Sequence, residues 1–308
     1  MKEKKTIRII LIVLAVLIVA GGVGYHLAMN LGKAPEKTDY AVDLDEVRRL
    51  ATESGGALPV EIRGTIIAES GMPDRMFIAG GGGDVSDWVF TTFQIVYGDR
   101  TIIVDPVNDE PLFEEWMYDL EFHRDAYEEM QAAMDGAWLI TATHEHWDHV
   151  GGLSMSPHVS ELMKKTVLTS EQVESPVIEE AGFPESIVEA YEPLEYEGLY
   201  PLAPGVVLIK SPGHTPGSQM IYVVLADGAE YLFIGDVVWQ WDNIERATIK
   251  PWLTSAMMKE DRDALKAETR WLSDLFLSSD TMLIPVISHD GVMIRGYFDD
   301  GIIIEGLL

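Results

Sequence analysis

Cysteine is absent from the 308-residue chain, and this absence narrows the chemistry open to the protein. Without thiols there is no disulfide framework, no thiolate metal site, no cysteine nucleophile and no cysteine to carry a lipid. Any bound metal must therefore be held by histidine and carboxylate side chains. The lack of cysteine does not itself decide on which side of a membrane the protein works.

Basic side chains are scarce as well. The chain has 22 Lys and Arg against 51 Asp and Glu, a formal net charge of -29. Residues 1–8 hold four of the basic side chains and one acidic one, so the rest carries 18 basic and 50 acidic side chains. Such a surface repels nucleic acid and anionic lipid headgroups. We expect no nucleic-acid partner and interpret the charge as a solubility feature of an exported domain.

Two common enzyme motifs are also missing. No Gly-x-Ser-x-Gly nucleophile motif occurs in the chain. The run Gly80-Gly81-Gly82-Gly83 lacks the lysine and the serine or threonine that complete a phosphate-binding loop. We interpret it as a mobile loop near the mouth of a site, because four glycines are too flexible for regular structure. The sequence therefore shows neither this serine-nucleophile motif nor a complete phosphate-binding loop.

One long apolar stretch stands near the N-terminus. Residues 9–25 contain no charged side chain, and the stretch continues through Met29, about the length needed to cross a bilayer as a helix. The basic residues precede it, so the positive-inside rule places residues 1–8 in the cytoplasm as a basic tail. We expect residues 9–29 to form a transmembrane anchor, with everything after them outside the cytoplasm. Ala20-Gly21-Gly22 keeps a second reading open, a cleaved signal peptide and a secreted protein.

The remainder divides into a polar linker, residues 30–59 with one helix over 43–52, and a catalytic domain, residues 60–308. Residue patterns predict strands over 61–68, 90–96 and 101–104, and helices over 112–134, 186–190 and 261–277. Four further apolar runs each lead to a metal-ligand residue: 138–141 to His144, 206–209 to His214, 231–234 to Asp236, and 282–287 to His289. Open α/β sheets carry their sites at such strand ends.

The densest cluster of ligand residues is Thr143-His144-Glu145-His146-Trp147-Asp148-His149, which holds three of the eight histidines in the chain. Imidazole and carboxylate are ligands that zinc and similar divalent metals prefer. In an extended segment, alternation points His144 and His146 the same way, leaving Asp148 and His149 free to turn toward a second ion.

These residues resemble motifs of the metallo-β-lactamase fold superfamily. The HEHWDH stretch is similar to its His-x-His-x-Asp-His signature, residues 211–218 (SPGHTPGS) to its Gly-His-Thr-x-Gly motif, Gly235-Asp236 to its bridging aspartate, and Ser288-His289-Asp290 to its last histidine. Asp105 resembles its first aspartate. The resemblance covers about residues 60–308 and implies an α/β fold, a four-layer αββα sandwich, which here would follow a transmembrane helix.

The resemblance also implies roles for single residues. His144, His146 and His214 would hold one metal ion, while Asp148, His149 and His289 hold a second, and Asp236 bridges the two. Asp105 would accept a hydrogen bond from outside the ligand set and fix a histidine tautomer. The ions implied are two divalent metals, zinc above all, with iron and manganese also found in the superfamily. A hydroxide shared by the two ions would attack a carbonyl or phosphoryl group, with Asp148 as the catalytic carboxylate that orients it.

The motifs look most like the branch of lactonases and small-ester hydrolases, which predicts a small ester, lactone or thioester as substrate. One residue departs from that branch, because those lactonases have a tyrosine three residues after the bridging aspartate and this chain has Trp239. Trp239, Trp241 and Trp252 are interpreted either as an apolar substrate wall or as ordinary aromatic residues. Three alternatives stay open: a β-lactam hydrolase, a mononuclear iron sulfur dioxygenase, and a catalytically silent metal-binding module. The sequence leaves open the oligomeric state.

Overall fold

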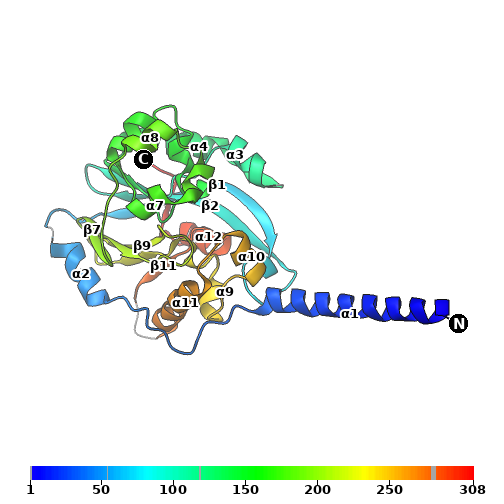
Figure 1. Ribbon diagram of the computed structural model, residues 1–308. Coiled ribbons are helices and arrows are strands. Elements are labelled where there is room, and N and C mark those ends of the chain that lie inside the picture. Colours follow the sequence, from blue (N-terminus) through cyan, green and yellow to red (C-terminus); the bar gives the residue numbers. More distant parts are fainter. Residues whose placement is uncertain (1, 54, 118, 279–281) are drawn as a thin grey trace.

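Two β-sheets packed face to face form the centre of the computed structural model, which describes residues 2–53, 55–117, 119–278 and 282–308 (Figure 1). The first sheet has the order β12-β1-β2-β3-β5-β6, with β4 paired to β1. Its strands are β1 (Glu61–Pro73), β2 (Val85–Val96), β3 (Thr101–Val104), β4 (Leu120–Phe122), β5 (Leu139–Thr141), β6 (Thr166–Val167) and β12 (Ile304–Glu305). The second sheet has the order β11-β10-β9-β8-β7, made of β7 (Leu199–Ala203), β8 (Val206–Lys210), β9 (Gln219–Val224), β10 (Glu230–Phe233) and β11 (Ile284–Val286).

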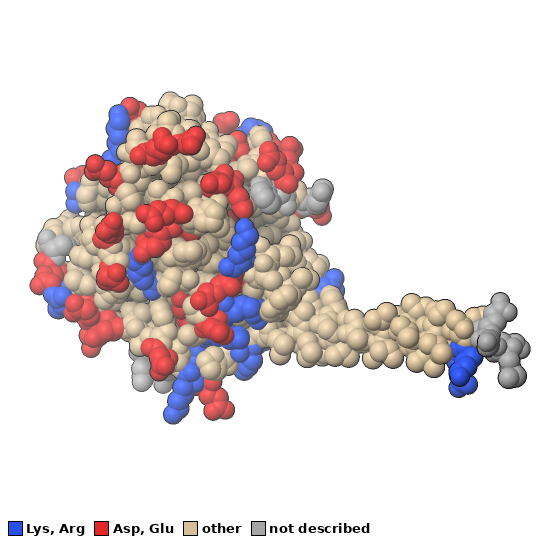
Figure 2. Space-filling view, viewed as in Figure 1, with Lys and Arg blue, Asp and Glu red and all other residues tan. Residues whose placement is uncertain are grey.

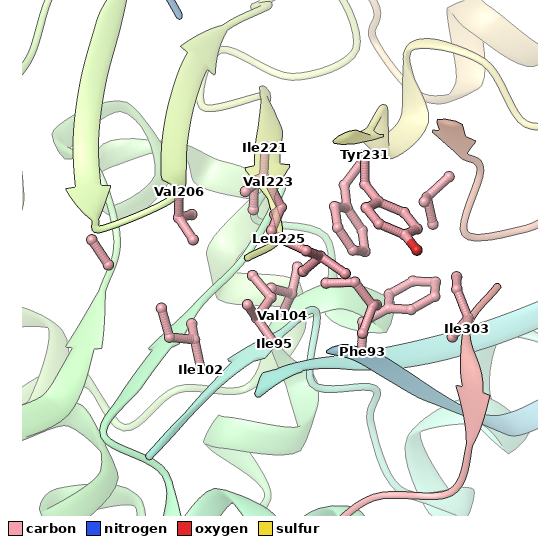
Figure 3. Close-up of a cluster of buried hydrophobic side chains, with 14 of the residues drawn as sticks. Phe93, Ile95, Ile102, Val104, Val206, Ile221, Val223, Leu225, Tyr231 and Ile303 are labelled. Carbon is pink, nitrogen blue, oxygen red and sulfur yellow. The ribbon is translucent and has the colours of Figure 1, made fainter. Parts of the chain in front are cut away.

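The space between the sheets is filled by apolar side chains (Figure 3). Alternation along each strand sends every second residue inward, so Phe93 and Ile95 of β2 meet Ile221 and Val223 of β9 in the same cluster. Burial of this shared face holds the two sheets in one fixed relation.

Helices cover the outer face of each sheet (Figure 1). The first sheet is covered by α3 (Glu110–Trp116), α4 (Arg124–Gly136) and α5 (Trp147–Ser154), whose buried residues pack with Phe90 and Ile103. The second is covered by α2 (Leu44–Glu53), α9 (Trp241–Glu245) and α11 (Arg262–Phe276), which pack with Ile209 and Leu232. The layers are thus helix, sheet, sheet and helix, the α/β sandwich that the sequence predicted.

The remaining elements are short and lie around this frame, apart from α1. They are α6 (Val159–Leu162), α7 (Ser170–Glu174), α8 (Glu185–Ala190), α10 (Trp252–Met257), α12 (Gly291–Asp299) and the 3-10 turns η1 (Asp74–Met76), η2 (Met163–Lys165), η3 (Pro176–Ala181) and η4 (Gly235–Val237). The strand predicted over 101–104 and the helices predicted over 186–190 and 261–277 are found within one residue of their expected ends. The strands predicted over 61–68 and 90–96 are found too, but β1 continues to Pro73 and β2 begins at Val85, five residues beyond the expected bound in each case.

The helix expected over residues 112–134 is wrong. The segment forms α3, the short strand β4 and then α4, and His123 stands at the start of α4 rather than inside a helix. Strand pairing overrides the helical spacing here, because Phe122 pairs with Ala68 of β1 and the His123 backbone N–H donates to the Ile67 carbonyl (2.8 Å).

The first helix, α1 (Lys2–Asn30), extends away from the rest of the molecule (Figure 1). Its stretch Lys5–Asn30 is long and apolar enough to cross a membrane by length and composition, and none of its most apolar window is buried against the protein. This finding agrees with the expected anchor but equally with a signal sequence.

The stretch 30–59, expected as a linker, is packed against the domain. Val47 and Ala51 of α2 are fully buried and join the apolar cluster on the outer face of the second sheet. Arg48 of the same helix pairs with Glu230 at 2.9 Å. The stretch therefore contributes to the core of the sandwich.

This packing predicts the effect of truncating Val47. Val47→Ala removes two buried methyl groups and is expected to lower the free energy of unfolding by about 2 kcal/mol. Thr52→Ala, on the exposed side of α2, is the matched control and is expected to change it by less than about 0.5 kcal/mol. Urea unfolding measures both values. Equal effects of the two substitutions would show that α2 behaves as a free linker helix.

Candidate metal centre

All seven predicted ligand residues stand just past the C-terminal ends of strands. His144 and His146 follow β5, and α5 begins immediately afterwards, so Asp148 and His149 lie in its first turn. His214 lies in the loop after β8, Asp236 in η4 after β10, and His289 between β11 and α12. Because these strands belong to both sheets, the site spans one edge of the sandwich.

The first group of side chains gathers around one oxygen of Asp236. His214 Nε2 lies 3.3 Å and His144 Nε2 lies 3.8 Å from Asp236 Oδ2. His146 Nδ1 lies 2.8 Å from His214 Nε2. Their ligand atoms all fall within 4.8 Å of one another, and all four residues are buried.

The second group gathers around the other oxygen of the same carboxylate. His289 Nε2 lies 3.2 Å and His149 Nε2 lies 3.5 Å from Asp236 Oδ1, and the two Nε2 atoms are 3.2 Å apart. Asp148 Oδ2 lies 3.6 Å from both of these histidine nitrogens. Asp236 therefore stands between two groups, in the position that a bridging ligand requires.

Acceptors outside these groups fix which ring nitrogen His149, His289 and His214 turn toward the centre of the site. His149 Nδ1 lies 3.0 Å from Asp105, His289 Nδ1 lies 2.8 Å from the Val89 carbonyl, and His214 Nδ1 lies 2.7 Å from Glu260. Each acceptor receives a hydrogen bond from Nδ1–H, so in the neutral rings the Nε2 lone pairs face the site. When both rings are neutral, the lone pairs of His149 and His289 point at each other, an arrangement that a proton or a metal cation between them relieves. His144 Nε2 and Asp236 Oδ1, both buried, have no hydrogen-bond partner among the described residues. The side chains fit a pair of divalent metal ions.

Burial and neighbouring charges together lower the pKa values of His144, His146 and Asp236. Burial and the nearby His149 hold the pKa of His144 well below its usual range, and burial with His214 does the same to the pKa of His146. Burial acts to raise the pKa of Asp236, but His289 and His149 outweigh it and hold that pKa well below its usual range. Neutral imidazole and ionised carboxylate are the forms that bind metal.

Three ligand residues depart from this pattern. Burial raises the pKa of Asp148. Burial and Lys250 act to lower the pKa of His214, but hydrogen bonds to Asp236 and Glu260 outweigh them and raise it. The third is His149. Burial lowers its pKa, but Asp148, Asp105 and Asp236 outweigh that effect and raise the pKa to about 10. The position therefore attracts positive charge, as a proton or as a metal ion.

Asp105 holds an unusual backbone conformation to reach its partners. Its φ angle is +54°, in the left-handed region that aspartate tolerates better than most residues. Its Oδ1 accepts from the Thr143 backbone N–H at 2.6 Å, and its Oδ2 lies 3.0 Å from His149. One buried carboxylate thus ties the end of β3 to the start of the histidine cluster.

Sequence reasoning missed Glu260 and Lys250. Glu260 Oε1 lies 2.7 Å from His214 Nδ1 and 2.9 Å from Lys250 Nζ, and Lys250 also donates to the Asp236 backbone carbonyl at 2.9 Å. Burial acts to raise the pKa of Glu260, but Lys250 and His214 outweigh it and lower the pKa to about 2. A lysine between Ile249 and Pro251 in an otherwise apolar run was the one sequence signal that a buried cation lay there.

Glu145 and Thr215 were also missed as partners. The Thr215 hydroxyl donates to Glu145 Oε2 at 2.7 Å, and both side chains are buried. This bond joins the loop that carries His144 and His146 to the loop that carries His214.

The three tryptophans considered as a substrate wall lie in different places. Trp239 is buried at the site, where its indole N–H donates to Asp236 Oδ2 at 2.5 Å and its ring packs on Phe77 and Trp88. Trp241 packs against Phe276 in the outer helical layer. Trp252 is exposed on α10. The structure therefore does not bring them together as one wall.

Comparisons with known proteins place relatives of this chain among lactonases and metal-dependent hydrolases. No family model matches the chain. The chain is 26% identical over 138 residues to an N-acyl homoserine lactonase of Bacillus thuringiensis, which is 44% of this chain and 53% of that protein. It is 27% identical over 109 residues to an N-acyl homoserine lactonase of Bacillus cereus, which is 34% of this chain and 40% of that protein. The matches span about half the length of these curated relatives or less.

Solved structures show the same fold over most of the chain. An N-acyl homoserine lactone hydrolase with the product N-hexanoyl-L-homoserine at its catalytic metal centre superposes with a TM-score of 0.58 at 15% identity, covering 78% of this chain and 96% of that one. A probable metal-dependent hydrolase from Staphylococcus aureus superposes with a TM-score of 0.56 at 12% identity, covering 77% and 91%. These findings confirm the lactonase-like resemblance that the motifs predicted.

A buried acid beside the site predicts a pH effect on stability. Burial raises the pKa of Glu268 to about 8, and Glu268 Oε1 accepts from the Gly213 N–H at 3.1 Å. In the unfolded chain this carboxyl ionises near its ordinary pKa of 4.5. Between these two values the folded protein keeps a proton that the unfolded chain has lost, so stability falls as pH rises.

Glu268→Gln keeps a side-chain oxygen that can accept from the Gly213 N–H and removes the titrating carboxyl group. We expect the variant to gain stability over the wild type as the pH rises from 5 to 8, by a few kcal/mol in urea unfolding. Both proteins are measured after removal of metal with a chelator, because a cation at His214 would change the pKa of Glu268 in the wild type alone. Glu128→Gln, at an exposed position of α4, is the control, and its stability is expected to follow that of the wild type from pH 5 to 8. Parallel pH curves for the wild type and Glu268→Gln would show that Glu268 ionises normally in the folded protein.

Proposed function

Because the chain has the metallo-β-lactamase fold and resembles N-acyl homoserine lactonases in sequence, we propose that it is a metal-dependent hydrolase that opens lactones. N-acyl homoserine lactones are the substrate class to test first. The observation that supports the proposal most is Asp236, whose two carboxylate oxygens each face a separate group of buried histidines. An arrangement of this kind has no use in packing, since burying so many polar groups without partners costs stability.

In this proposal the site holds two divalent cations. His144, His146, His214 and Asp236 hold one, and Asp148, His149, His289 and Asp236 hold the other. Nitrogen and carboxylate ligands without thiolates suit zinc, and zinc is the metal we propose.

When bound, two such ions lower the pKa of a water molecule toward neutrality and polarise the ester carbonyl. The protein supplies the rest. Asp148 has a partly exposed side chain (12%), whereas the side chains of His149, Asp236 and His289 are almost fully covered. Its carboxylate is therefore the group that meets incoming substrate and water, and it takes the proton that the attacking water loses and returns it to the departing alkoxide.

Trp239 acts on the site in a different way from the tyrosine found at this position in the lactonases. Its single N–H is committed to Asp236 Oδ2, so it orients the bridging carboxylate. It has no second donor for the oxygen on which negative charge develops. The leaving oxygen must then rely on Asp148, and we expect substrates with good leaving groups to be opened fastest.

We further propose that α1 anchors the enzyme in a membrane with the catalytic domain outside the cytoplasm. The support is the apolar stretch Lys5–Asn30 and the basic residues that precede it. Signal cleavage and secretion are the alternative outcome, and the mass of the mature protein distinguishes them.

The full chain, purified in detergent without added metal, tests the hydrolase proposal. Elemental analysis is expected to give about two zinc ions per chain, and the protein is expected to open N-acyl homoserine lactones and lose this activity after chelation. Asp148→Asn is expected to lower kcat by about 100-fold or more, and Glu189→Gln, at an exposed position of α8, serves as the control.

The other outcomes of the same test each contradict the proposal. One iron per chain with oxygen-dependent turnover would indicate a dioxygenase. Hydrolysis of β-lactams but not lactones would move the activity to that class. Full metal occupancy without hydrolysis of any ester, thioester or β-lactam would indicate a silent metal-binding module.

Trp239→Phe tests the role of the indole N–H. The substitution keeps an aromatic ring but leaves Asp236 Oδ2 without its donor, so we expect metal affinity to fall about tenfold. Trp241→Phe, the same change two residues away in the outer helical layer, is expected to leave metal affinity unchanged. Competition with a chromophoric chelator measures both. Equal affinities of the Trp239→Phe variant and the wild type would show that the indole only fills space.

A further inference from the structure

Helix α10 has its amphipathic pattern reversed. The small polar residues Thr254 and Ser255 are buried, while Trp252, Leu253 and Met257 are 52%, 40% and 69% exposed. A surface helix in water normally turns its apolar side inward. Three large apolar side chains turned outward on two turns of helix mark a contact surface rather than scattered exposure.

This helix lies beside the base of α1, where the apolar helix joins the domain (Figure 1). Figure 2 shows that the uncharged surface of α1 continues onto the adjoining part of the domain, whereas acidic side chains are spread over much of the rest of this view. Leu31, the first residue after α1, is 58% exposed and belongs to the same surface. The exposed apolar area is therefore continuous with the candidate membrane span.

Basic side chains gather at the same junction. A hollow of about 310 Å³ is lined by Asn30, Leu31, Gly32, Lys33, Trp252, Arg262 and Lys266. Arg262 donates to the Lys250 carbonyl at 3.1 Å, to the Ser255 hydroxyl and to the Leu31 carbonyl, and Lys33 donates to the Arg246 carbonyl. Among the described residues neither Lys33 nor Arg262 has a carboxylate within 4 Å. Lys266 reaches Asp263 at 3.6 Å, and that carboxylate side chain is 97% exposed.

The junction is thus less acidic than the protein as a whole, although Asp261 and Asp263, which flank Arg262 in the sequence, offset part of its positive charge. Net charge predicted repulsion from anionic lipid headgroups, but at this junction positive charges stand without full compensation beside exposed apolar residues. A tryptophan flanked by lysine and arginine is the composition typical of segments that sit at the membrane–water interface.

The junction between α1 and the domain is closely packed. The Gly80 N–H donates to the Met29 carbonyl, the Ile249 N–H to the Gly32 carbonyl and the Ala34 N–H to the Ala247 carbonyl, each at 2.9 Å. A Cβ at Gly32 would come within 2.8 Å of the Ile249 carbonyl oxygen, so only glycine fits there. The glycine run expected as a mobile loop supplies one of these bonds. A helix held in this way leaves the domain in a set direction.

We propose that this surface, made of Leu31, Lys33, Trp252, Leu253, Met257, Arg262 and Lys266, docks onto a phospholipid bilayer that contains anionic headgroups. We call it the α10 face. Trp252, Leu253 and Met257 enter the interfacial layer, and Lys33, Arg262 and Lys266 meet lipid phosphates. The inference rests on the proposed anchoring by α1, since that helix brings the α10 face to the headgroup level. It adds that the catalytic domain itself binds the membrane surface.

The absence of cysteine makes the test direct, because single cysteines can be introduced and labelled in the full chain. Met257→Cys reports on the α10 face, Val16→Cys on the apolar part of α1, and Ser186→Cys on α8, which lies away from α1 (Figure 1). Each variant carries a fluorescent label and is reconstituted into vesicles of phosphatidylcholine mixed with phosphatidylglycerol. The vesicles contain phospholipids with a nitroxide quencher either at the headgroup or deep in the acyl chain.

The expected result is a graded pattern. The label at position 257 is quenched by headgroup nitroxide, the label at 16 by acyl-chain nitroxide, and the label at 186 by neither. Quenching at 16 without quenching at 257 would overturn the docking inference and leave the anchor standing. No quenching at 16 would overturn the anchor itself, so the two failures are distinguishable.

A third outcome identifies another occupant. If the label at 257 is protected from a water-soluble quencher but is not reached by lipid nitroxide, a second copy or another protein covers the α10 face, and the bilayer inference is wrong.

The charge contribution is tested with Lys266→Gln in the Met257→Cys background. Each basic side chain near an anionic surface contributes about 1 kcal/mol, so the ratio of docked to undocked domain is expected to fall about fivefold. Lys164→Gln, an exposed lysine whose nearest partner is Glu161, is the matched control and leaves the ratio unchanged. Equal docking of the Lys266→Gln variant and its parent, or equal docking on phosphatidylcholine alone, would show that lipid phosphate is not what Lys266 recognises.

Discussion

The carboxylate of Asp236 is the constraint on which the rest of the site depends. Its two oxygens face two histidine groups that arrive from separate strands, so neither group can shift without losing one side of the arrangement. Five imidazoles and two acids gathered in a nearly water-free space repel or desolvate one another unless positive charge stands among them. Asp105, Glu260 and the Val89 carbonyl accept hydrogen bonds from His149, His214 and His289 and so orient three of the five imidazoles before any ion arrives.

The two sheets matter because the site draws on both of them. β5 of the first sheet delivers the histidine cluster, while β8, β10 and β11 of the second deliver His214, Asp236 and His289. A small slide of one sheet over the other would separate the two halves of the metal centre. The apolar layer between the sheets is therefore part of what sets the distances at the site, although none of its side chains has a chemical role there (Figure 3).

Site residues that belong to rare residue types or to recognisable motifs could be predicted from the sequence. Site residues whose role depends on a distant partner in the fold could not. The seven ligand-type side chains could be named because histidine is rare here, the apolar runs before them have a strand pattern, and the motifs that contain them resemble those of the metallo-β-lactamase fold superfamily. Glu260 could not, since one glutamate among many acidic residues carries no local sign that it meets His214 and Lys250. The prediction of a helix over 112–134 was wrong for a related reason. The spacing of apolar residues within 112–134 gives no sign that β4 pairs with β1, a strand about 50 residues earlier in the chain. The reversed pattern of α10 likewise became visible only with burial known.

The tight fit at Gly32 has a mechanical consequence. A transmembrane helix changes its tilt to match its apolar length to the thickness of the bilayer. Met29 of α1 and the residues just after it, Gly32 and Ala34, are each joined to the domain by a backbone hydrogen bond, so a change in tilt would rotate the whole sandwich with the helix. For a protein anchored by α1, the lipid composition of the membrane would then set the angle at which the edge carrying Asp236 faces the surrounding solution.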